Sequence, residues 1–448
     1  MSKVHLDLVI TPGTWSTQAP LLKRTPAGLF NLIGWFGSTH ASAAWRKDRN
    51  FLNIFAENNF PGFDPQIDDW DLSYAQIEAE VMASASVIVI RLENHELLNS
   101  SLGSVAETGL ALVSAALRGQ TVIVSLEEKL LATLKEPGAI AQYMMLEMWL
   151  EQIAGMKEFN GLLRLHRGDD LILLATTCCL AAKHRMQQNG GSFIDFDKFL
   201  EKRARRRQNY PKRILVGGSG GAYDESRQQS FLTKRNAVMA AFPKEESSFK
   251  ILSEGAIAKA WQIPYGSIDH LGGALATRIL LAIETEYKRE ADILLLPVMA
   301  EAASKAAVTE IGFLLLYALT TGQDVRVYLE PFDPVDFIRC QLGEINISGF
   351  TTEEEMRQAL LQAGVASNIL VAAVKTEVEE AFALFKAMLA DDSPTLGQVK
   401  QSLLGKTEAY QKADNIRRVR ALVQAHLERL VQSPRFPEFF SYSTQISA

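Results

Sequence analysis

Short apolar runs alternate with longer amphipathic stretches along most of the chain. The runs are rich in β-branched residues and apolar at consecutive positions, which is typical of strands buried on both faces of a sheet. The clearest are SVIVI (86–90), TVIVSL (121–126), RILVGG (213–218), DILLLPV (292–298) and DVRVYL (324–329). The stretches between them have helical periodicity. Strands that alternate with helices predict an α/β architecture, with parallel sheets covered by helices on both faces.

One segment of this pattern occurs twice. With Glu107 placed on Glu310, ETGLALVSAALRGQTVIVSLE lies over EIGFLLLYALTTGQDVRVYLE without a gap, and ten of the 21 positions are identical. Upstream, IEAEVMASASVIVI (77–90) lies over IETEYKREADILLL (283–296). The same order of elements in both places indicates an internal duplication.

The duplication predicts two tandem doubly wound domains (Rossmann- or flavodoxin-like) with parallel sheets. We place the first at residues 1–205, the second at 206–395 and a helical C-terminal extension at 396–448. The charged junction at 198–213 contains a proline and is typical of a linker. A strand followed by a helix is expected to end each repeat, at 161–185 and 368–389. The Phe-rich tail after residue 432 is expected to dock on the body of the protein or on a second copy.

Composition and charge exclude several classes of protein. Hydrophobic residues make up 47% of the chain and charged residues 22%, as in ordinary globular proteins. The formal net charge of −6 gives no global basic field, so nucleic acid is not an expected partner. Three cysteines are too few for a disulfide framework, and the adjacent Cys178 and Cys179 are expected to be buried, unreactive thiols. We find neither a signal peptide nor a membrane span, and therefore expect a cytoplasmic protein.

Two glutamates at equivalent places in the duplication are candidates for chemistry. Ser104 and Glu107 fit a capping box, in which the two side chains satisfy free N–H groups at the start of a helix. In the second copy Ala307 replaces the serine, yet Glu310 remains, which favours a chemical role. A carboxylate in the first turn of a helix is kept ionised by the helix dipole. Beside the carboxyl end of a parallel strand, it is a suitable oxygen nucleophile for a sugar carbon.

Serines and glycines near these glutamates predict a phosphate-binding site. Ser101 and Ser304 each stand six residues before the glutamate, where a hydroxyl and free helix N–H groups form an anion cradle, although a turn explains a serine equally well. A Gly-Ser turn with an arginine nine residues after the glycine adds close backbone approach and a cation. These residues are Gly37, Ser38 and Arg46 in the first copy and Gly218, Ser219 and Arg227 in the second. Neither turn has the spacing of a dinucleotide-binding fingerprint.

Other acidic residues surround the expected site. Glu78 and Glu284 lie on the helix before the strand that leads to each key glutamate. Each either belongs to a solvated helix face or touches a base or a sugar hydroxyl as an acid or orienting group. Asp69 and Trp70 belong to an acidic loop that either lines the substrate or forms an ordinary turn. The histidines and cysteines lack zinc-ligand spacing, so no metal is expected, and no cofactor either.

The order of these motifs resembles the nucleoside 2-deoxyribosyltransferase superfamily. The resemblance rests on the Gly-Ser turn, the W-R pair, F-D-P followed by D-W, the E-x-E helix, SVIVI and SLGSVAETGLAL. SLGSVAE, which contains Gly103, is especially similar to the branch of 2′-deoxynucleoside 5′-phosphate N-hydrolases. The resemblance implies that Glu107 and Glu310 attack the anomeric carbon and form a glycosyl-enzyme.

It further implies that Ser101 and Ser304 lie at the phosphorylated 5′ end of the sugar. Glu78 and Glu284 stand where that branch has an aspartate, a departure that bears on how the leaving base is protonated. Members of the superfamily are homo-oligomers whose sites are completed by a neighbour, and two fused copies could reproduce such a dimer within one chain.

We therefore expect an enzyme that cleaves or exchanges the N-glycosidic bond of a (deoxy)nucleoside or nucleoside 5′-phosphate through a glutamate nucleophile. Its partner would be this small molecule, and a homo-oligomer fits the resemblance. Two alternatives stay open. One is a non-catalytic nucleotide-binding sensor or scaffold. The other is a glycohydrolase that depletes NAD or nucleotides in phage defence.

Overall fold

Each of the five apolar runs forms a strand in the computed structural model of the chain. All of them pair in parallel, so the predicted α/β architecture with parallel sheets is confirmed. The structure describes residues 5–37, 43–66, 72–93, 102–127, 137–188, 190–209, 212–217, 233, 236–238, 240, 250–253, 282–298, 305–331, 418–433, 436 and 439–444.

The first sheet has six parallel strands in the order β1-β3-β2-β4-β5-β6. Its strands are β1 (Val9–Ile10), β2 (Phe30–Phe36), β3 (Gly62–Phe63), β4 (Ala85–Leu92), β5 (Thr121–Leu126) and β6 (Leu163–Arg167). The central strands β4 and β5 are buried at every position, as runs that are apolar on both faces require.

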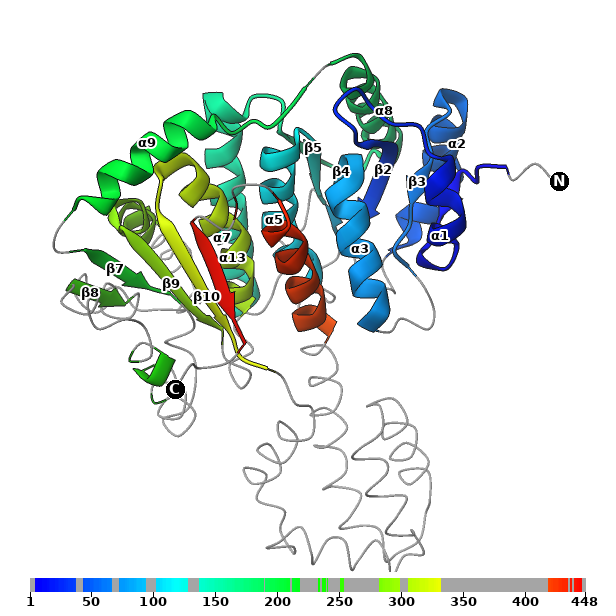
Figure 1. Ribbon diagram of the computed structural model, residues 1–448. Coiled ribbons are helices and arrows are strands. Elements are labelled where there is room, and N and C mark those ends of the chain that lie inside the picture. The colour runs from blue at the N-terminus through cyan, green and yellow to red at the C-terminus, as the bar shows by residue number, and fades with distance from the viewer. Residues whose placement is uncertain are drawn as a thin grey trace, which may run out of the picture. The chain divides into compact units, whose positions relative to one another are not determined.

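Helices cover both faces of this sheet (Figure 1). One face carries α2 (Arg49–Asn58) and α8 (Leu171–Gln187), whose apolar residues form a core with Trp35 of β2. The other face carries α3 (Leu72–Ser84) and α5 (Leu102–Arg118). The shorter helical segments are η1 (Pro12–Thr14), α1 (Trp15–Gln18), η2 (Ala19–Leu21), η3 (Ala43–Lys47) and η4 (Lys157–Phe159).

Cys178 and Cys179 are residues of α8, and their side chains lie in the core that this helix covers. Burial raises the pKa of Cys178 well above its usual value and that of Cys179 to about 11. Thiols with such pKa values are almost fully protonated at neutral pH and therefore unreactive. The prediction of buried, inert cysteines is confirmed for these two residues.

The second sheet has five parallel strands in the order β8-β7-β9-β10-β11. Its strands are β7 (Arg213–Val216), β8 (Lys250–Ser253), β9 (Ile293–Val298), β10 (Asp324–Leu329) and β11 (Phe440–Ser443). The outer strand β11 comes from the C-terminal tail and pairs with β10. The tail therefore docks on the body of the protein, which is one of the two outcomes we expected. The strand and helix expected at 368–389 lie outside the described residues.

The two sheets share one strand order. Without β1, the first reads β3-β2-β4-β5-β6 and the second β8-β7-β9-β10-β11, and each is the 2-1-3-4-5 order of flavodoxin-like sheets. Aligned residues also make the same hydrogen bonds: Gln120 Nε2 donates to the carbonyl oxygen of Met82, and Gln323 Nε2 donates to that of Lys288. We call the segments that hold β1–β6 and β7–β11 the first and second half. The domain boundaries at 205 and 395 stay predictions.

The two halves meet where α5 packs on α13 (Lys305–Thr321). The helices cross at the aligned glycines: a Cβ on Gly312 would lie 2.1 Å from the carbonyl carbon of Gly109, and one on Gly109 would lie 3.0 Å from the Cα of Gly312. No side chain fits between the backbones there, so both positions require glycine. The contact is self-complementary, like the two-fold interface of a homodimer.

Arginines of the charged junction bind backbone and side-chain groups of the second half, so they do not only face solvent. α9 (Phe196–Arg207) begins at the N-cap Asp195. Arg206 of this helix donates to the carbonyl oxygens of Ala291 and Thr321, both at 2.7 Å, at the carboxyl ends of a helix over 282–290 and of α13. Arg203 pairs with Asp324 at 2.7 Å. Cations are favourable at helix C-termini, so part of this basic run stabilises the fold.

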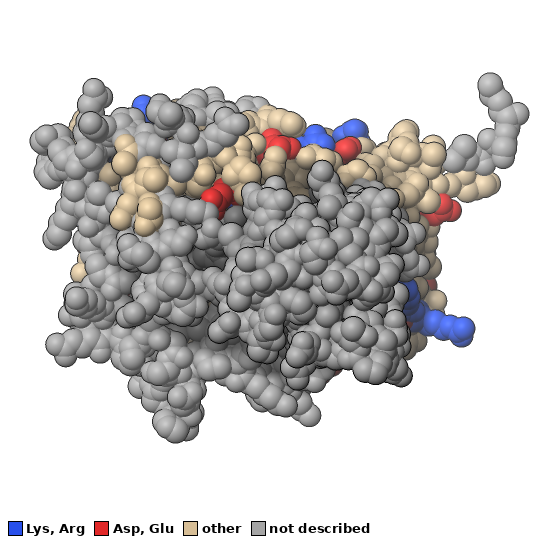
Figure 2. Space-filling view, turned by 90° about the horizontal axis from the view of Figure 1, so that it is seen from below, with Lys and Arg blue, Asp and Glu red and all other residues tan. Residues whose placement is uncertain are grey.

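The chain divides into two compact units, residues 1–330 with 421–448 and residues 331–420. The first unit also contains α7 (Pro137–Gly155) and most of a helix over 418–431. The part of the described surface that is visible in Figure 2 carries both acidic and basic side chains. No helix among the described residues is long and apolar enough to cross a membrane.

Candidate active site

The strands β2, β3 and β4 end at the carboxyl edge of the first sheet. Because β2 lies between β3 and β4, the chain reverses its direction across the sheet at β2/β4, and ligands of parallel α/β sheets bind at such switch points. Gly37 follows β2, Asp64 follows β3, and α5, which carries Glu107, follows β4. The fold therefore brings the residues singled out in the sequence to one edge of the sheet.

Gly37 lets the first turn approach the neighbouring strand. Its φ is +82°, and a Cβ there would lie 2.4 Å from the carbonyl oxygen of Arg91 on β4. Both the left-handed φ and the close approach require glycine. The close approach here is to the protein's own backbone, so the part of the Gly-Ser turn in phosphate binding stays a prediction.

Arg46 lies in a buried cluster of charges at this edge. Its Nη1 is 3.1 Å from Asp64 Oδ1, and its Nη2 donates to the carbonyl oxygen of Gly37. Burial lowers the pKa of Arg46, while attraction by Asp64, Glu78 and Glu107 opposes that effect. Glu78 and Glu107 therefore lie within electrostatic reach of one arginine. The guanidinium is already bonded within the protein, so its role as a phosphate partner stays a prediction.

Glu107 lies deeper in its helix than the sequence suggested. α5 begins at Leu102, so Ser104 is its third residue and Glu107 its sixth, with no acidic residue in the first turn. The capping box is therefore wrong: Ser104 is inside the helix, where its carbonyl oxygen accepts a hydrogen bond from Thr108 Oγ1 at 2.8 Å. The sequence placed Glu107 in the first turn, where the helix dipole stabilises a carboxylate. Because the dipole effect falls off within that turn, it does not extend to Glu107.

A histidine from the far end of the chain faces Glu107. Nε2 of His426, on the helix over 418–431, lies 3.5 Å from Glu107 Oε1, and the two side chains are 4% and 6% exposed. Neither atom has a hydrogen-bond partner among the described residues. A buried carboxylate oxygen without a donor is costly, and in native proteins it needs an explanation such as catalysis.

The equivalent glutamate of the second half is held differently. Lys288 Nζ donates to Glu310 Oε1 at 2.6 Å and lies 4.0 Å from Glu284 Oε2. All three side chains are at most 4% exposed. The ring of Trp149 on α7 covers the ammonium group, with 5.5 Å from Nζ to the ring centroid. Glu284 and Glu310, both predicted site residues, therefore share one buried cation.

The structure brings some predicted residues together and does not describe others. Gly103 lies on α5 beneath the helix that carries His426, since a Cβ there would be 3.3 Å from Leu422 Cδ1. The predicted site residues outside the described part of the chain are Ser38, Asp69, Trp70, Ser101, Gly218, Ser219, Arg227 and Ser304.

Sequence reasoning missed His426 and Lys288. The alignment contains a signal for Lys288, because IETEYK places it where IEAEVM has Met82. His426 has no such signal, since only the folded chain brings the C-terminal helix to Glu107.

The chemistry available here is that of carboxylates, a guanidinium and an imidazole. In the described ranges, no group of three His, Cys, Asp or Glu side chains is placed to hold a metal ion. No family model, curated protein or solved structure matches the chain.

Proposed function

We propose that the protein cleaves or exchanges the N-glycosidic bond of a nucleoside or nucleoside 5′-phosphate, with Glu107 as the nucleophile. The observation that carries this proposal is the Glu107 carboxylate itself. It is 5% exposed, lies in the electrostatic reach of Arg46, and has one oxygen without a hydrogen-bond donor among the described residues. The resemblance of the surrounding motifs supports the reaction class, and the switch point supports the location.

The proposed reaction has two displacements. A carboxylate oxygen of Glu107 bonds to the sugar C1 while the C1–N bond breaks and its electron pair passes to the base nitrogen. Glu78, buried on α3, is the candidate donor of the proton that the leaving base takes up. A water oxygen then bonds to C1, the electron pair of the ester bond returns to Glu107, and the proton of the water returns to Glu78. A second base in place of the water gives exchange.

Electrostatics favour this chemistry. Three carboxylates, those of Asp64, Glu78 and Glu107, act on the single guanidinium of Arg46. With Asp64 and Glu107 ionised and Glu78 protonated as the donor, the cluster has one negative charge more than Arg46 offsets. That excess stabilises the positive charge that develops on the sugar when an N-glycosidic bond breaks.

The proposal is tested with a panel of nucleosides, nucleoside 5′-monophosphates and NAD, with free base measured by chromatography. Glu107→Gln should abolish base release because it removes the nucleophile. The control is Glu80→Gln, which changes an acid of α3 that is 44% exposed and should keep the wild-type rate. Full base release by E107Q contradicts the mechanism. Binding of a nucleotide without release of base from any substrate favours the sensor.

A further inference from the structure

The last helix and strand of the two halves correspond. In the turn after α7, Met156 N donates to the carbonyl oxygen of Ile153 at 3.1 Å. In the turn after the helix over 418–431, Ser433 N donates to that of Leu430 at 2.9 Å. The strands that follow, β6 and β11, lie beside β5 and β10, which are themselves aligned. Trp149 and His426 stand four residues before Ile153 and Leu430, so they occupy equivalent positions.

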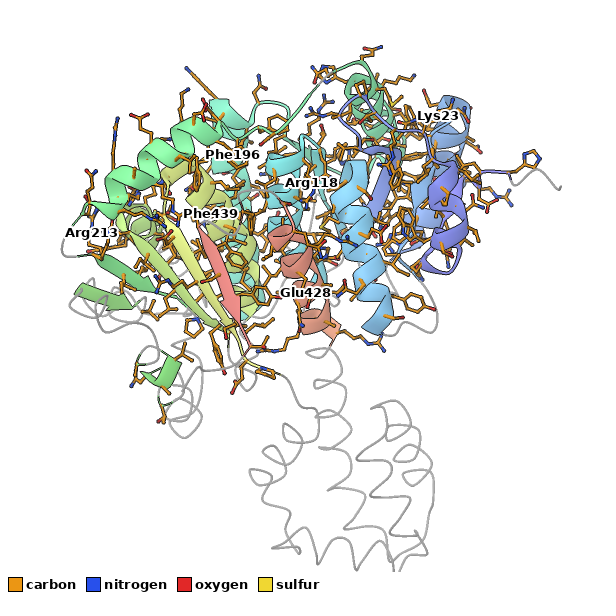
Figure 3. All side chains as sticks on the ribbon, in the orientation of Figure 1. Lys23, Arg118, Phe196, Arg213, Glu428 and Phe439 are labelled. Atoms are coloured by element: carbon orange, nitrogen blue, oxygen red, sulfur yellow. The ribbon has the colours of Figure 1, made fainter. Side chains whose placement is uncertain are left out.

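The helix over 418–431 packs on the first half, although the strand after it belongs to the second. Its Ala425 packs against Ala75 and Ala79 of α3. Arg118 Nη2 of α5 donates to Ser433 Oγ at 2.6 Å, at the end of this helix (Figure 3). These contacts fix the position of the helix over 418–431 along α5, and therefore the place at which His426 faces α5.

α7 makes the reciprocal contact with the second half. The rings of Trp149 and Phe313 on α13 are 4.5 Å apart. Tyr317, one turn further along α13, donates its hydroxyl to Gln152 Oε1. Each half therefore supplies one helix that packs on the other half, and the residue at the equivalent position differs. It is a histidine facing Glu107 in one case and a tryptophan covering Lys288, which binds Glu310, in the other.

A second position also differs between the halves. Met82 is aligned with Lys288, and it lines a cavity of about 10 Å³ together with His426. The first half thus has an apolar side chain where the second has the ammonium group that binds Glu310. At the position aligned with Lys288 the first half therefore has no ammonium group, and Glu107 faces the imidazole of His426 instead.

We propose that only the first half carries out the reaction, with His426 as a positioning residue for Glu107, whereas Lys288 holds Glu310 in a structural ion pair. This inference rests on the proposed function. An ion pair with a buried ammonium group stabilises the ionised carboxylate, and that stabilisation is lost when the carboxylate becomes a neutral ester, so Glu310 is the weaker nucleophile. Among the described residues, Glu107 faces an imidazole at 3.5 Å and no ammonium group.

The role of His426 follows from its geometry. With the proton on Nε2, the imidazole directs a donor at Glu107 Oε1 and leaves Oε2 to attack C1. The separation of 3.5 Å is longer than a hydrogen bond, and catalytic hydrogen bonds commonly tighten only when the substrate is bound. The same donor stabilises the carboxylate when it leaves C1 in the second displacement.

The first test compares stability and needs no substrate. Glu310→Gln should lower the midpoint of thermal unfolding, because it weakens a 2.6 Å ion pair that has no equivalent at Glu107. Glu107→Gln should leave the midpoint unchanged or raise it, as substitutions of strained functional groups do. Equal decreases for the two variants overturn the inference, whether or not a substrate is found.

The second test measures turnover of the nucleotide found with the panel. His426→Leu should lower kcat by about 100-fold, the cost of a misplaced catalytic group, and leave KM nearly unchanged. His426→Gln, which keeps a donor, should recover part of that loss. Glu428→Gln is the control: this residue of the same helix is half-buried, and its carboxylate accepts from Gln76 Nε2, a bond that the glutamine can keep. A wild-type kcat in His426→Leu overturns the role of His426.

The third test transfers the lysine. Met82→Lys should abolish turnover in a folded protein, because it places an ammonium group beside Glu107 as Lys288 does beside Glu310. Met82→Leu should keep most of the rate. Full turnover by Met82→Lys overturns the inference. If Glu107→Gln also turns over at the full rate, the proposed function fails as well; if Glu107→Gln is inactive, only this inference fails.

Discussion

Replacement of Lys288 by methionine gives the second half the residue that the first half has at the aligned position. The variant removes the ammonium group 2.6 Å from Glu310 and 4.0 Å from Glu284, and keeps a long apolar side chain. Two buried carboxylates are then left without their shared cation. Both side chains are at most 4% exposed, so water cannot replace the lysine without local opening.

The expected loss is large. Removal of one partner from a buried ion pair costs about 3–5 kcal/mol, because the other charge stays buried and unpaired. The contact of the ammonium with the ring of Trp149, at 5.5 Å, adds about 0.5–2 kcal/mol. Part of this is offset by the burial of the methionine, so we expect a net decrease of about 3–5 kcal/mol in the free energy of unfolding. That is a large fraction of the stability of a typical domain.

The assay is urea unfolding followed by circular dichroism, on the wild type, Lys288→Met, Glu310→Gln and the double variant. Both single variants remove the same interaction. The free energy of unfolding should therefore decrease less in the double variant than the sum of the decreases in the two single variants. A decrease below about 1 kcal/mol for Lys288→Met, or losses that add within about 0.5 kcal/mol, would show that the pair does not stabilise the fold.

Three further predictions follow from the described contacts. Gly312→Ala should destabilise the protein by at least about 1–3 kcal/mol, because the new Cβ would lie 2.1 Å from the Gly109 backbone. Gly103→Ala should cost less, because its Cβ meets only a side chain, at 3.3 Å. Urea unfolding measures both variants. Gly37→Ala should lower base release with little change in secondary structure, since it displaces the turn that accepts from Arg46; a wild-type rate in the panel assay would argue against that role. Cys179 should resist alkylation at pH 8 in the folded protein, because its pKa is raised to about 11. The unfolded thiol loses its proton from about pH 9, so the contribution of Cys179 to the free energy of unfolding should fall as pH rises from about 9 to 11. Cys179→Ala should reduce this pH dependence.

The central strands and the duplication could be predicted because their signals are local. Runs such as 86–90 and 121–126 are apolar at every position, and the gap-free match between the copies reappears as matched hydrogen bonds of Gln120 and Gln323. β1 and β3 are two residues long, too short to form an apolar run, and were not predicted. The start of α5 was placed too late, because the Ser104–Glu107 spacing imitates a capping box inside a helix.

The parts of the site that could not be predicted depend on contacts between distant segments. His426 reaches Glu107 only because α5 and α13 cross at two glycines and the last helix of the second half lies over the first. The pairing of β11 with β10 likewise joins the C-terminal tail to a strand more than a hundred residues earlier. Glu107 and Glu310 look alike in the alignment, and what separates them, the residues at 82 and 288, lies on a neighbouring helix.

The measurement that tests the central claim most directly is a mass spectrum of the protein after a short incubation with a nucleotide that it turns over, stopped with acid. The account predicts a mass increase equal to one sugar phosphate less one water, located on the peptide that contains Glu107 and absent from Glu107→Gln. Two results would contradict the account. One is a sugar adduct on the Glu310 peptide, and the other is turnover that forms no adduct and continues in Glu107→Gln.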